Sequence, residues 1–147
     1  MDSMTWILVA DASTARFFRA HKASLFNGNG GNLSLIGTHT HEDSRKSDSE
    51  LVSDKQGRFG HATFVEKTDP HKHQEDIFAL ALARKLTQDF DVNHFKNLII
   101  IAPPTFMGLL NKHIESHPIA KLENLKIEKD YTRYDAAEIV KRLQDYL

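Results

Sequence analysis

Residues 97–104 read Asn97-Leu98-Ile99-Ile100-Ile101-Ala102-Pro103-Pro104, and this stretch determines which fold the rest of the chain can adopt. The apolar run is too short for a helix, and its three adjacent isoleucines favour a β-strand. Because no polar residue alternates with the apolar ones, the strand is predicted to be central and covered on both faces. The two prolines end it, since proline cannot donate to the hydrogen-bond ladder of a sheet.

Helical patterns lie on both sides of this strand. The range 75–90 has large apolar residues at helical spacing, and the range 105–114 forms an amphipathic stripe with Thr105 as its expected N-cap. The stretch Asp135-Ala136-Ala137-Glu138 is an aspartate variant of the capping box, and it is expected to open a last helix. The sequence therefore predicts three main helices.

Strand-forming residues dominate the first third of the chain. The ranges 5–10 and 15–20 are predicted to pair as a hairpin, the range 33–41 follows as a third strand, and the range 125–131 is a fifth, more polar strand. Three antiparallel strands followed by two helix-linked strands predict an α/β fold, a single domain over residues 1–147. The expected architecture is a mixed five-stranded sheet with three main helices and a ribonuclease H-like topology.

Composition limits the classes of function that the chain can have. Its 147 residues are 40% hydrophobic and 27% charged, which is typical of one globular domain. The net charge of −1 excludes a global field that attracts nucleic acid, so any such contact needs a local patch. The lack of cysteine excludes disulfides and thiolate metal sites. The N-terminal apolar run is too short for a signal peptide or a membrane helix, so a cytoplasmic location without membrane insertion is expected.

A long polar segment at about 42–73 separates the strand-rich third from the helical part, and it contains a loop with functional character. Cationic side chains in this loop can hold phosphate, glycines let backbone amides approach it, and an aromatic ring can stack on a base. The alternative is a surface turn whose phenylalanine is anchored in the core. The candidate binding residues, called the 54–60 loop below, are Asp54, Lys55, Gln56, Gly57, Arg58, Phe59 and Gly60.

Acidic residues offer a second kind of site. Ribonuclease H-like nucleases bind Mg²⁺ through carboxylates at the ends of sheet strands, and Asp11 follows the first predicted strand. The acids that can converge on it are Glu42, Asp43, Asp54 and Asp130, and the alternative catalytic pair is Asp11 with Asp54. The favoured interpretation is simpler, because an Asp-x-Ser sequence commonly caps a turn through its carboxylate.

The chain has nine histidines, and four of them form two close pairs. His39 and His41 are two apart on a predicted strand and so share a face, while His71 and His73 lie in the polar segment. Such pairs can bind zinc or nickel, but no metal-specific spacing occurs. Scattered surface histidines are the favoured interpretation, and no cofactor is expected.

Several stretches resemble the bacterial host attachment protein family, also described as protein required for attachment to host cells. Their order and spacing carry the resemblance over nearly the whole chain. The stretches are Trp6-Ile7-Leu8-Val9-Ala10-Asp11 with Ala15-Arg16-Phe17-Phe18, then Leu51-Val52-Ser53-Asp54-Lys55-Gln56-Gly57-Arg58, Phe78-Ala79-Leu80-Ala81, Leu98-Ile99-Ile100-Ile101-Ala102-Pro103-Pro104, Phe106-Met107-Gly108-Leu109, and Glu128-Lys129-Asp130-Tyr131-Thr132.

This resemblance implies a relation to the central domain of archaeal and eukaryotic peptide-chain release factors and of Pelota. In release factors the corresponding loop carries Gly-Gly-Gln and promotes peptidyl-tRNA hydrolysis. This chain instead has Gln56-Gly57-Arg58 and Gly60, so release activity is not expected.

The expected function is therefore a non-catalytic, release-factor-like module that binds RNA, the ribosome or a protein partner through the 54–60 loop. A metal-dependent phosphodiesterase or nuclease that uses Asp11 and neighbouring acids is one alternative. A structural adaptor that affects cell attachment indirectly is another.

Overall fold

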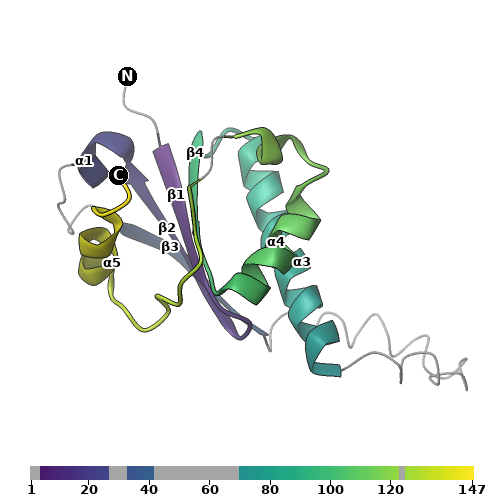
Figure 1. Ribbon diagram of the computed structural model, residues 1–147. Helices are drawn as coiled ribbons and strands as arrows, with labels where there is room; N and C mark the ends of the chain where they lie inside the picture. The colour runs from purple at the N-terminus through teal and green to yellow at the C-terminus, as the bar shows by residue number, and fades with distance from the viewer. Residues whose placement is uncertain (1–3, 27–32, 42–69, 123–124) are drawn as a thin grey trace, which may run out of the picture.

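The computed structural model describes residues 4–26, 33–41, 70–122 and 125–147. Its five strands form one sheet in the order β3-β2-β1-β4-β5 (Figure 1). The strands are β1 (Met4–Ala10), β2 (Thr14–His21), β3 (Ser34–Thr40), β4 (Asn97–Ile101) and β5 (Leu125–Ile127).

The sheet is mixed, because its two halves pair in different ways. β2 is antiparallel to both β1 and β3, whereas β4 is parallel to both β1 and β5. The short connection between β1 and β2 permits a hairpin, but a parallel pair needs a crossover, which the segment between β3 and β4 provides. The predicted α/β class and five-stranded mixed sheet are confirmed, and the strand order is compatible with a ribonuclease H-like topology.

Helices cover both faces of the sheet (Figure 1). α3 (Pro70–Asp91) and α4 (Pro104–Ile114) lie on one face, and the short helix η3 (Pro118–Lys121) packs near α3. α1 (Lys22–Phe26) and α5 (Ala136–Leu143) lie on the other face. The structure is therefore three layers deep.

Two apolar cores follow from this layering, and β1 and β4 contribute to both. Alternate side chains of a strand point to opposite faces, so Leu8 and Ile100 enter the first core while Ile7 and Ile99 enter the second. Ile99, Ile100 and Ile101 are all buried, which confirms the prediction of a strand covered on both faces.

The first core lies between the sheet and α3 with α4, and it is rich in aromatic rings. Trp6 stacks on Phe95 at 4.9 Å between ring centroids, and it meets Phe17 edge to face at 6.0 Å. The large buried members of this core are Trp6, Leu8, Phe17, Phe78, Leu82, Leu86, Phe95, Leu98, Ile100, Phe106, Met107, Leu110, Ile114 and Ile119. The second core, under α1 and α5, contains Ile7, Val9, Phe18, Leu25, Ile99, Ile101, Ile127, Tyr131, Ile139, Val140 and Leu143.

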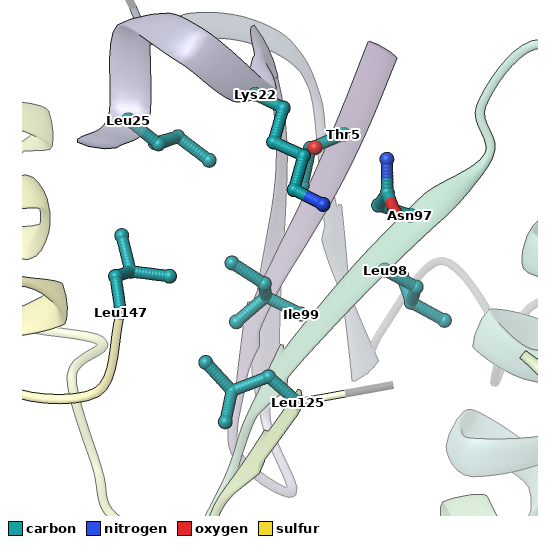
Figure 2. A pocket seen from close by; sticks show the side chains of 8 residues that line it. All are labelled: Thr5, Lys22, Leu25, Asn97, Leu98, Ile99, Leu125 and Leu147. Carbon is teal, nitrogen blue, oxygen red and sulfur yellow. The ribbon is translucent and has the colours of Figure 1, made fainter. Parts of the chain in front are cut away.

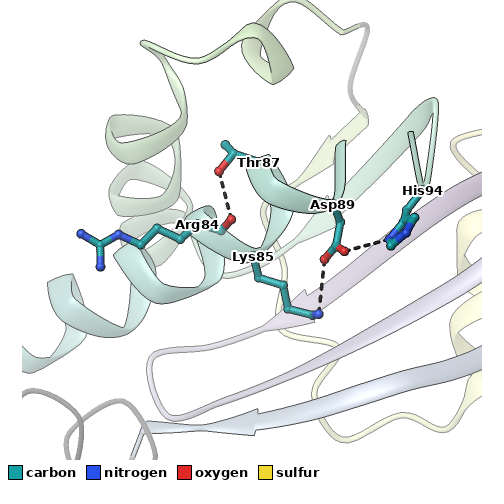
Figure 3. A network of polar contacts seen from close by, with 5 residues as sticks. All are labelled: Arg84, Lys85, Thr87, Asp89 and His94. Atoms are coloured by element: carbon teal, nitrogen blue, oxygen red, sulfur yellow. Dashed lines mark hydrogen bonds and ion pairs between the residues drawn. The ribbon is translucent and has the colours of Figure 1, made fainter. Parts of the chain in front are cut away.

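A polar network secures the last turns of α3 against the first core (Figure 3). The carboxylate of Asp89 accepts from Lys85 Nζ at 3.3 Å and contacts His94 Nδ1 at 2.8 Å. The same ammonium group of Lys85 lies 5.6 Å from the centroids of both Trp6 and Phe17, a cation–π geometry. The guanidinium of Arg84 points away from this network.

Three predicted boundaries and one predicted cap are wrong. α3 begins at Pro70, so residues 70–73 are helical and do not belong to a polar loop; proline suits the first turn of a helix, where its missing N–H is not needed. For the same reason α4 starts at Pro104 with Pro103 as N-cap, and Thr105 lies inside the helix instead of capping it. β5 ends at Ile127, short of the expected residue 131.

The remaining helices differ in how well the sequence predicts them. α1 was not predicted, because its five residues are too few for a periodic pattern. In α5 the carboxylate of Asp135 accepts from the backbone N–H of Glu138 at 2.9 Å, so the predicted aspartate cap is confirmed. No helix in the described part of the chain is long and apolar enough to cross a membrane.

Candidate functional site

The carboxyl ends of β1, β4 and β5 meet at one edge of the sheet, because these three strands are parallel. Asp11 follows β1 directly, and Asp130 lies three residues after the end of β5. In open α/β sheets this edge is where ligands most often bind. The polar side chains in this place form what is called the carboxyl edge below.

The carboxylate of Asp11 is engaged by the backbone of the β1–β2 turn. Its Oδ1 atom accepts from the N–H groups of Ser13 and Thr14, both at 2.8 Å. The backbone N–H of Asp11 in turn donates to the carbonyl of Thr14 at 2.9 Å. Asp11 is thus a turn-capping residue, as the favoured interpretation of its sequence context predicts.

The hydroxyl of Thr132 brings Asp11 and Asp130 together. It lies 3.4 Å from Asp11 Oδ2 and makes a short hydrogen bond to Asp130 Oδ1, and its single proton can serve only one of them at a time. The backbone N–H of Thr132 also donates to Asp130 Oδ1 at 2.9 Å. The hydrogen bonds from the Thr132 side chain and backbone lower the pKa of Asp130, and the charge of Arg133 adds to the effect.

Two of the acids expected to converge are therefore linked through one threonine. The others, Glu42, Asp43 and Asp54, lie outside the described residues. Among the residues that the structure does describe, no group of three or more His, Cys, Asp or Glu side chains is arranged to hold a metal ion.

Arg16, on β2, fixes the backbone between β5 and α5. Its Nη2 atom donates to the carbonyl oxygens of Tyr131, Thr132 and Tyr134 at 3.3, 3.1 and 2.7 Å. Burial lowers the pKa of this guanidinium, and the nearby charge of Asp135 partly offsets the effect. A charged donor shared by three carbonyls replaces the strand pairing that ends with β5, so Arg16 acts as a clamp on this segment.

Aromatic contacts also support the segment between β5 and α5. Tyr131 and Tyr134 meet edge to face at 5.4 Å, and the guanidinium of Arg142 lies 4.2 Å from the centroid of Tyr134. Burial raises the pKa of Tyr131, so this phenol stays neutral in the physiological range. Arg142 also pairs with Glu138 at 2.9 Å along α5. The carboxyl edge is therefore held by interactions within the fold.

A third polar cluster joins α3 to α4. Asp76 Oδ1 lies 2.9 Å from Lys112 Nζ and 2.8 Å from His113 Nε2. Burial by itself would raise the pKa of Asp76, but the hydrogen bonds and charges of Lys112 and His113 outweigh it and lower the pKa. The cluster ties the exposed beginning of α3 to the end of α4.

The first turn of α3 is exposed and basic. Pro70, His71, Lys72 and His73 are all solvent-exposed, whereas the first fully buried residue of the helix is Phe78. In Figure 1 this part of α3 extends past the end of the sheet. The segment that precedes it in the chain includes the 54–60 loop, whose residues lie outside the described part of the structure.

The four candidate metal-binding histidines fall into two environments. His39 packs edge to face on Phe17 at 5.3 Å, and His41 packs on Phe78 at 6.2 Å, so both rings face the first core. This agrees with the expectation that the two share a face. His71 and His73 are instead in the exposed first turn of α3.

Arg16, Thr132, Asp76 and His113 are among the polar residues whose contacts the sequence did not predict. Arg16 appears in a stretch that resembles the family, but its three partners are backbone carbonyls more than one hundred residues away, as the sequence separations of 115 to 118 show. Backbone carbonyls leave no signal in a sequence. The Asp76–His113 contact likewise joins two helices whose pairing no periodicity reveals.

The class of protein that these features define is an α/β domain with one apolar core on each face of its sheet and a polar stretch of sequence between β3 and α3. Comparison with protein families finds that residues 6–143 match the family described as "Protein required for attachment to host cells". The match covers nearly all of the chain, so the chain belongs to this family, as the resemblance of its motifs indicated. A comparison with curated proteins found no match.

Proposed function

We propose that this chain is a non-catalytic binding module that acts inside the cell and contacts RNA phosphates, on the ribosome, through its 54–60 loop. The observation that carries the proposal is the exposed basic first turn of α3, with His71, Lys72 and His73, at the point where the polar segment rejoins the frame. Lys55 and Arg58 in the loop add positive charge from the adjacent stretch of chain.

The physical argument is one of local charge. The net charge of −1 provides no general attraction to nucleic acid, so binding depends on cations gathered in one place. Arginine grips phosphate with two parallel N–H donors, and an adjacent phenylalanine ring gives a base a surface to stack on. Arg58 and Phe59 supply this combination.

The proposed relation to the central domain of release factors and Pelota supports the ribosome as the partner. Because Gly-Gly-Gln is absent from the 54–60 loop, the proposal includes binding and no peptidyl-tRNA hydrolysis. The family description concerns attachment to host cells. In this proposal, binding to the ribosome affects attachment indirectly, through translation.

The experiment is co-sedimentation of the purified protein with bacterial ribosomes across a salt series, with the wild type and Arg58→Ala compared. Arg58→Ala is expected to weaken binding and to reduce the slope of log affinity against log salt by about one unit, since one phosphate contact is lost. Thermal stability should stay unchanged, because the proposal gives this side chain a role in binding and none in the fold.

Arg84→Ala is the matched control. It removes the same charge from an exposed arginine that points away from the Asp89 network (Figure 3). It should leave both binding and the salt slope as in the wild type. If Arg58→Ala and Arg84→Ala behave alike, the loop does not bind RNA. If the wild type does not sediment with ribosomes at low salt, the adaptor alternative is supported instead.

A metal-dependent phosphodiesterase is the second candidate, and one observation favours it. Asp11 Oδ2 and Asp130 Oδ1 both lie within reach of the Thr132 hydroxyl, so two carboxylates are close together at the carboxyl edge. Hydrolysis of RNA or DNA in the presence of Mg²⁺ or Mn²⁺, lost in Asp130→Asn, would establish this activity. Unchanged cleavage in Asp130→Asn would assign any observed activity to a contaminant.

A further inference from the structure

The first two turns of α3 project from the rest of the described fold (Figure 1). Pro70 is the first residue of the helix and Phe78 is its first buried residue, so residues 70–77 precede the point where the helix enters the first core. At a rise of about 1.5 Å per residue, this part of the helix is about 12 Å long. Contacts outside the core therefore help to hold its direction.

One carboxylate within this projecting part contacts α4. Asp76 Oδ1 lies 2.9 Å from Lys112 Nζ and 2.8 Å from His113 Nε2, and both partners belong to the last turn of α4. The side chains of Asp76 and His113 are 34% and 16% exposed, so solvent screens their contact less than it screens a fully exposed pair. Burial alone would raise the pKa of Asp76, but Lys112 and His113 lower it, so the carboxylate is ionised at neutral pH.

The same projecting part carries the basic residues on which the proposed function depends. His71, Lys72 and His73 lie in its first turn, and all three are exposed. The first turn of a helix is easily frayed, because its N–H groups have no acceptor within the helix. A contact with α4 one turn further along the helix therefore limits how far this basic turn can move.

We propose that Asp76 is a positioning residue for the basic turn of α3. It holds the helix against Lys112 and His113, so that the basic turn meets RNA phosphates in one fixed direction, while Asp76 itself does not touch the RNA. The inference rests on the proposed function, because it concerns the same basic turn. A turn that is already ordered loses less freedom on binding, and this strengthens the affinity.

The sign of the effect separates positioning from simple electrostatics. Asp76 is negative and lies one turn from the basic residues, so its direct effect on RNA is repulsion. If charge alone mattered, its removal would strengthen binding. A positioning role predicts the opposite, so Asp76→Ala should weaken binding although the substitution makes this part of α3 more basic.

The first measurement uses the free protein and needs no RNA. In an α-helix the backbone N–H groups of residues 74–77 donate to the carbonyls of residues 70–73, so their hydrogen exchange reports the order of the projecting part. In Asp76→Ala these amides should exchange about five- to tenfold faster than in the wild type. The amides of the buried residues Leu82 and Leu86 should exchange at the wild-type rate, which excludes a global loss of stability.

The second measurement is co-sedimentation with bacterial ribosomes across a salt series. Asp76→Ala should bind about three- to tenfold more weakly, in proportion to the smaller ordered fraction of the turn. The slope of log affinity against log salt should stay as in the wild type, because no phosphate contact is lost. Asp76→Asn keeps an oxygen that Lys112 and His113 can donate to, and it should restore most of the exchange protection and of the affinity.

Glu75→Ala is the matched control. It removes the same charge from the neighbouring residue of the same turn, whereas the contacts with Lys112 and His113 are made by Asp76. It should leave the exchange of amides 74–77 as in the wild type, and its affinity for ribosomes should be equal or slightly higher.

Three outcomes would overturn the proposal. Unchanged exchange of amides 74–77 in Asp76→Ala would mean that the turn is held without this contact. Faster exchange combined with wild-type or stronger binding would mean that the direction of the turn does not matter for RNA. Failure of the wild type to sediment with ribosomes at low salt would overturn the proposed function, and this inference with it, whatever the exchange data show for Asp76→Ala.

Discussion

The two ends of the sheet hold their polar side chains in different ways. At the carboxyl edge, Asp11, Arg16 and Thr132 all bind partners within the fold, with Arg16 alone reaching three carbonyls. At the amino end, the Thr5 hydroxyl is buried and lacks a hydrogen-bond partner in the described part of the chain. The polar groups of the carboxyl edge therefore stabilise the fold. At the amino end, the unpartnered hydroxyl of Thr5 destabilises it.

This difference teaches that the position of polar residues in a fold does not by itself indicate a binding site. The carboxyl ends of parallel strands are the expected place for ligands, yet here the polar groups at that edge serve the backbone. The amino end carries fewer polar residues, but they line a cavity beside Thr5 (Figure 2). Whether each polar group already has a hydrogen-bond partner within the fold decides which end can accept a ligand.

Ile100, in the middle of the central strand β4, gives a reference value for the changes in unfolding free energy expected at the two ends. Ile100 is fully buried in the first core, so Ile100→Ala should lower the free energy of unfolding by about 2–5 kcal/mol through lost burial and a residual cavity. Reversible urea unfolding measures the loss. Lys126→Ala, at the exposed register partner on β5, serves as the control and should change little. A loss below about 1 kcal/mol for Ile100→Ala would mean that this position is not tightly packed.

Removing the clamp should produce the largest effect at either end. Arg16→Leu leaves the carbonyls of the 131–134 segment without their donor and should cost about 2 kcal/mol of stability. Arg19→Leu changes an exposed arginine on the same strand and should alter stability by no more than about 0.5 kcal/mol. Equal effects of the two substitutions, measured by chemical denaturation, would show that the carboxyl edge does not depend on its hydrogen bonds.

Two substitutions at Asp11 separate its role as a turn cap from any role that requires its negative charge. Asp11→Ala removes two backbone hydrogen bonds and should cost about 1–2 kcal/mol in the unfolding free energy. Asp11→Asn keeps an oxygen that can accept from Ser13 and Thr14, so it should be close to wild type. If the asparagine variant were as unstable as the alanine variant, the negative charge of Asp11 would be what the carboxyl edge requires.

At the amino end, removing a polar group should raise the free energy of unfolding, whereas at the carboxyl edge it should lower it. Thr5→Val exchanges an unpartnered buried hydroxyl for a methyl group of similar shape, and it should raise stability by up to about 1 kcal/mol. Thr38→Val on the exposed side of β3 is the control, with little change expected. A destabilised Thr5→Val would indicate that the hydroxyl already has a partner in solution, such as an ordered water.

The smallest effect concerns the response of the carboxyl edge to acid. The folded-state pKa of Asp130 lies below its ordinary value, so its stabilising contribution is present above the unfolded-state pKa and is lost as pH falls through the folded one. Thr132→Val removes the side-chain hydrogen bond and should raise the pKa of Asp130, as a carboxyl NMR titration would measure. The pKa of Asp76, set by burial and by Lys112 and His113, should not move. Identical Asp130 titrations in both proteins would exclude Thr132 as the cause.

The sequence predicts the frame well because the frame depends on local patterns. The isoleucines of β4, the alternation of β3 and the cap at Asp135 all follow from periodicity and from the chemistry of single residues. α1 escapes prediction because five residues show no helical period.

The polar contacts are only partly predictable. The role of Asp11 as a turn cap follows from its neighbours Ser13 and Thr14, so the sequence is sufficient there. The clamp by Arg16 and the cavity beside Thr5 depend instead on which strands lie next to each other, and this pairing follows from the tertiary fold. The 54–60 loop remains a prediction, since it lies outside the described residues.

The parallel pairing of β1 with β4 has a consequence for how this family can vary. Thr5 and Asn97 are partners although most of the chain separates them, so folding must close a long connection before this pair forms. The entropy of closing a loop grows only slowly with length, by about 0.6 kcal/mol for each doubling. Insertions and deletions in the stretch between β3 and α3 should therefore change the folding free energy little. Evolution can exchange that stretch for sequences of other lengths and specificities while the two cores stay the same.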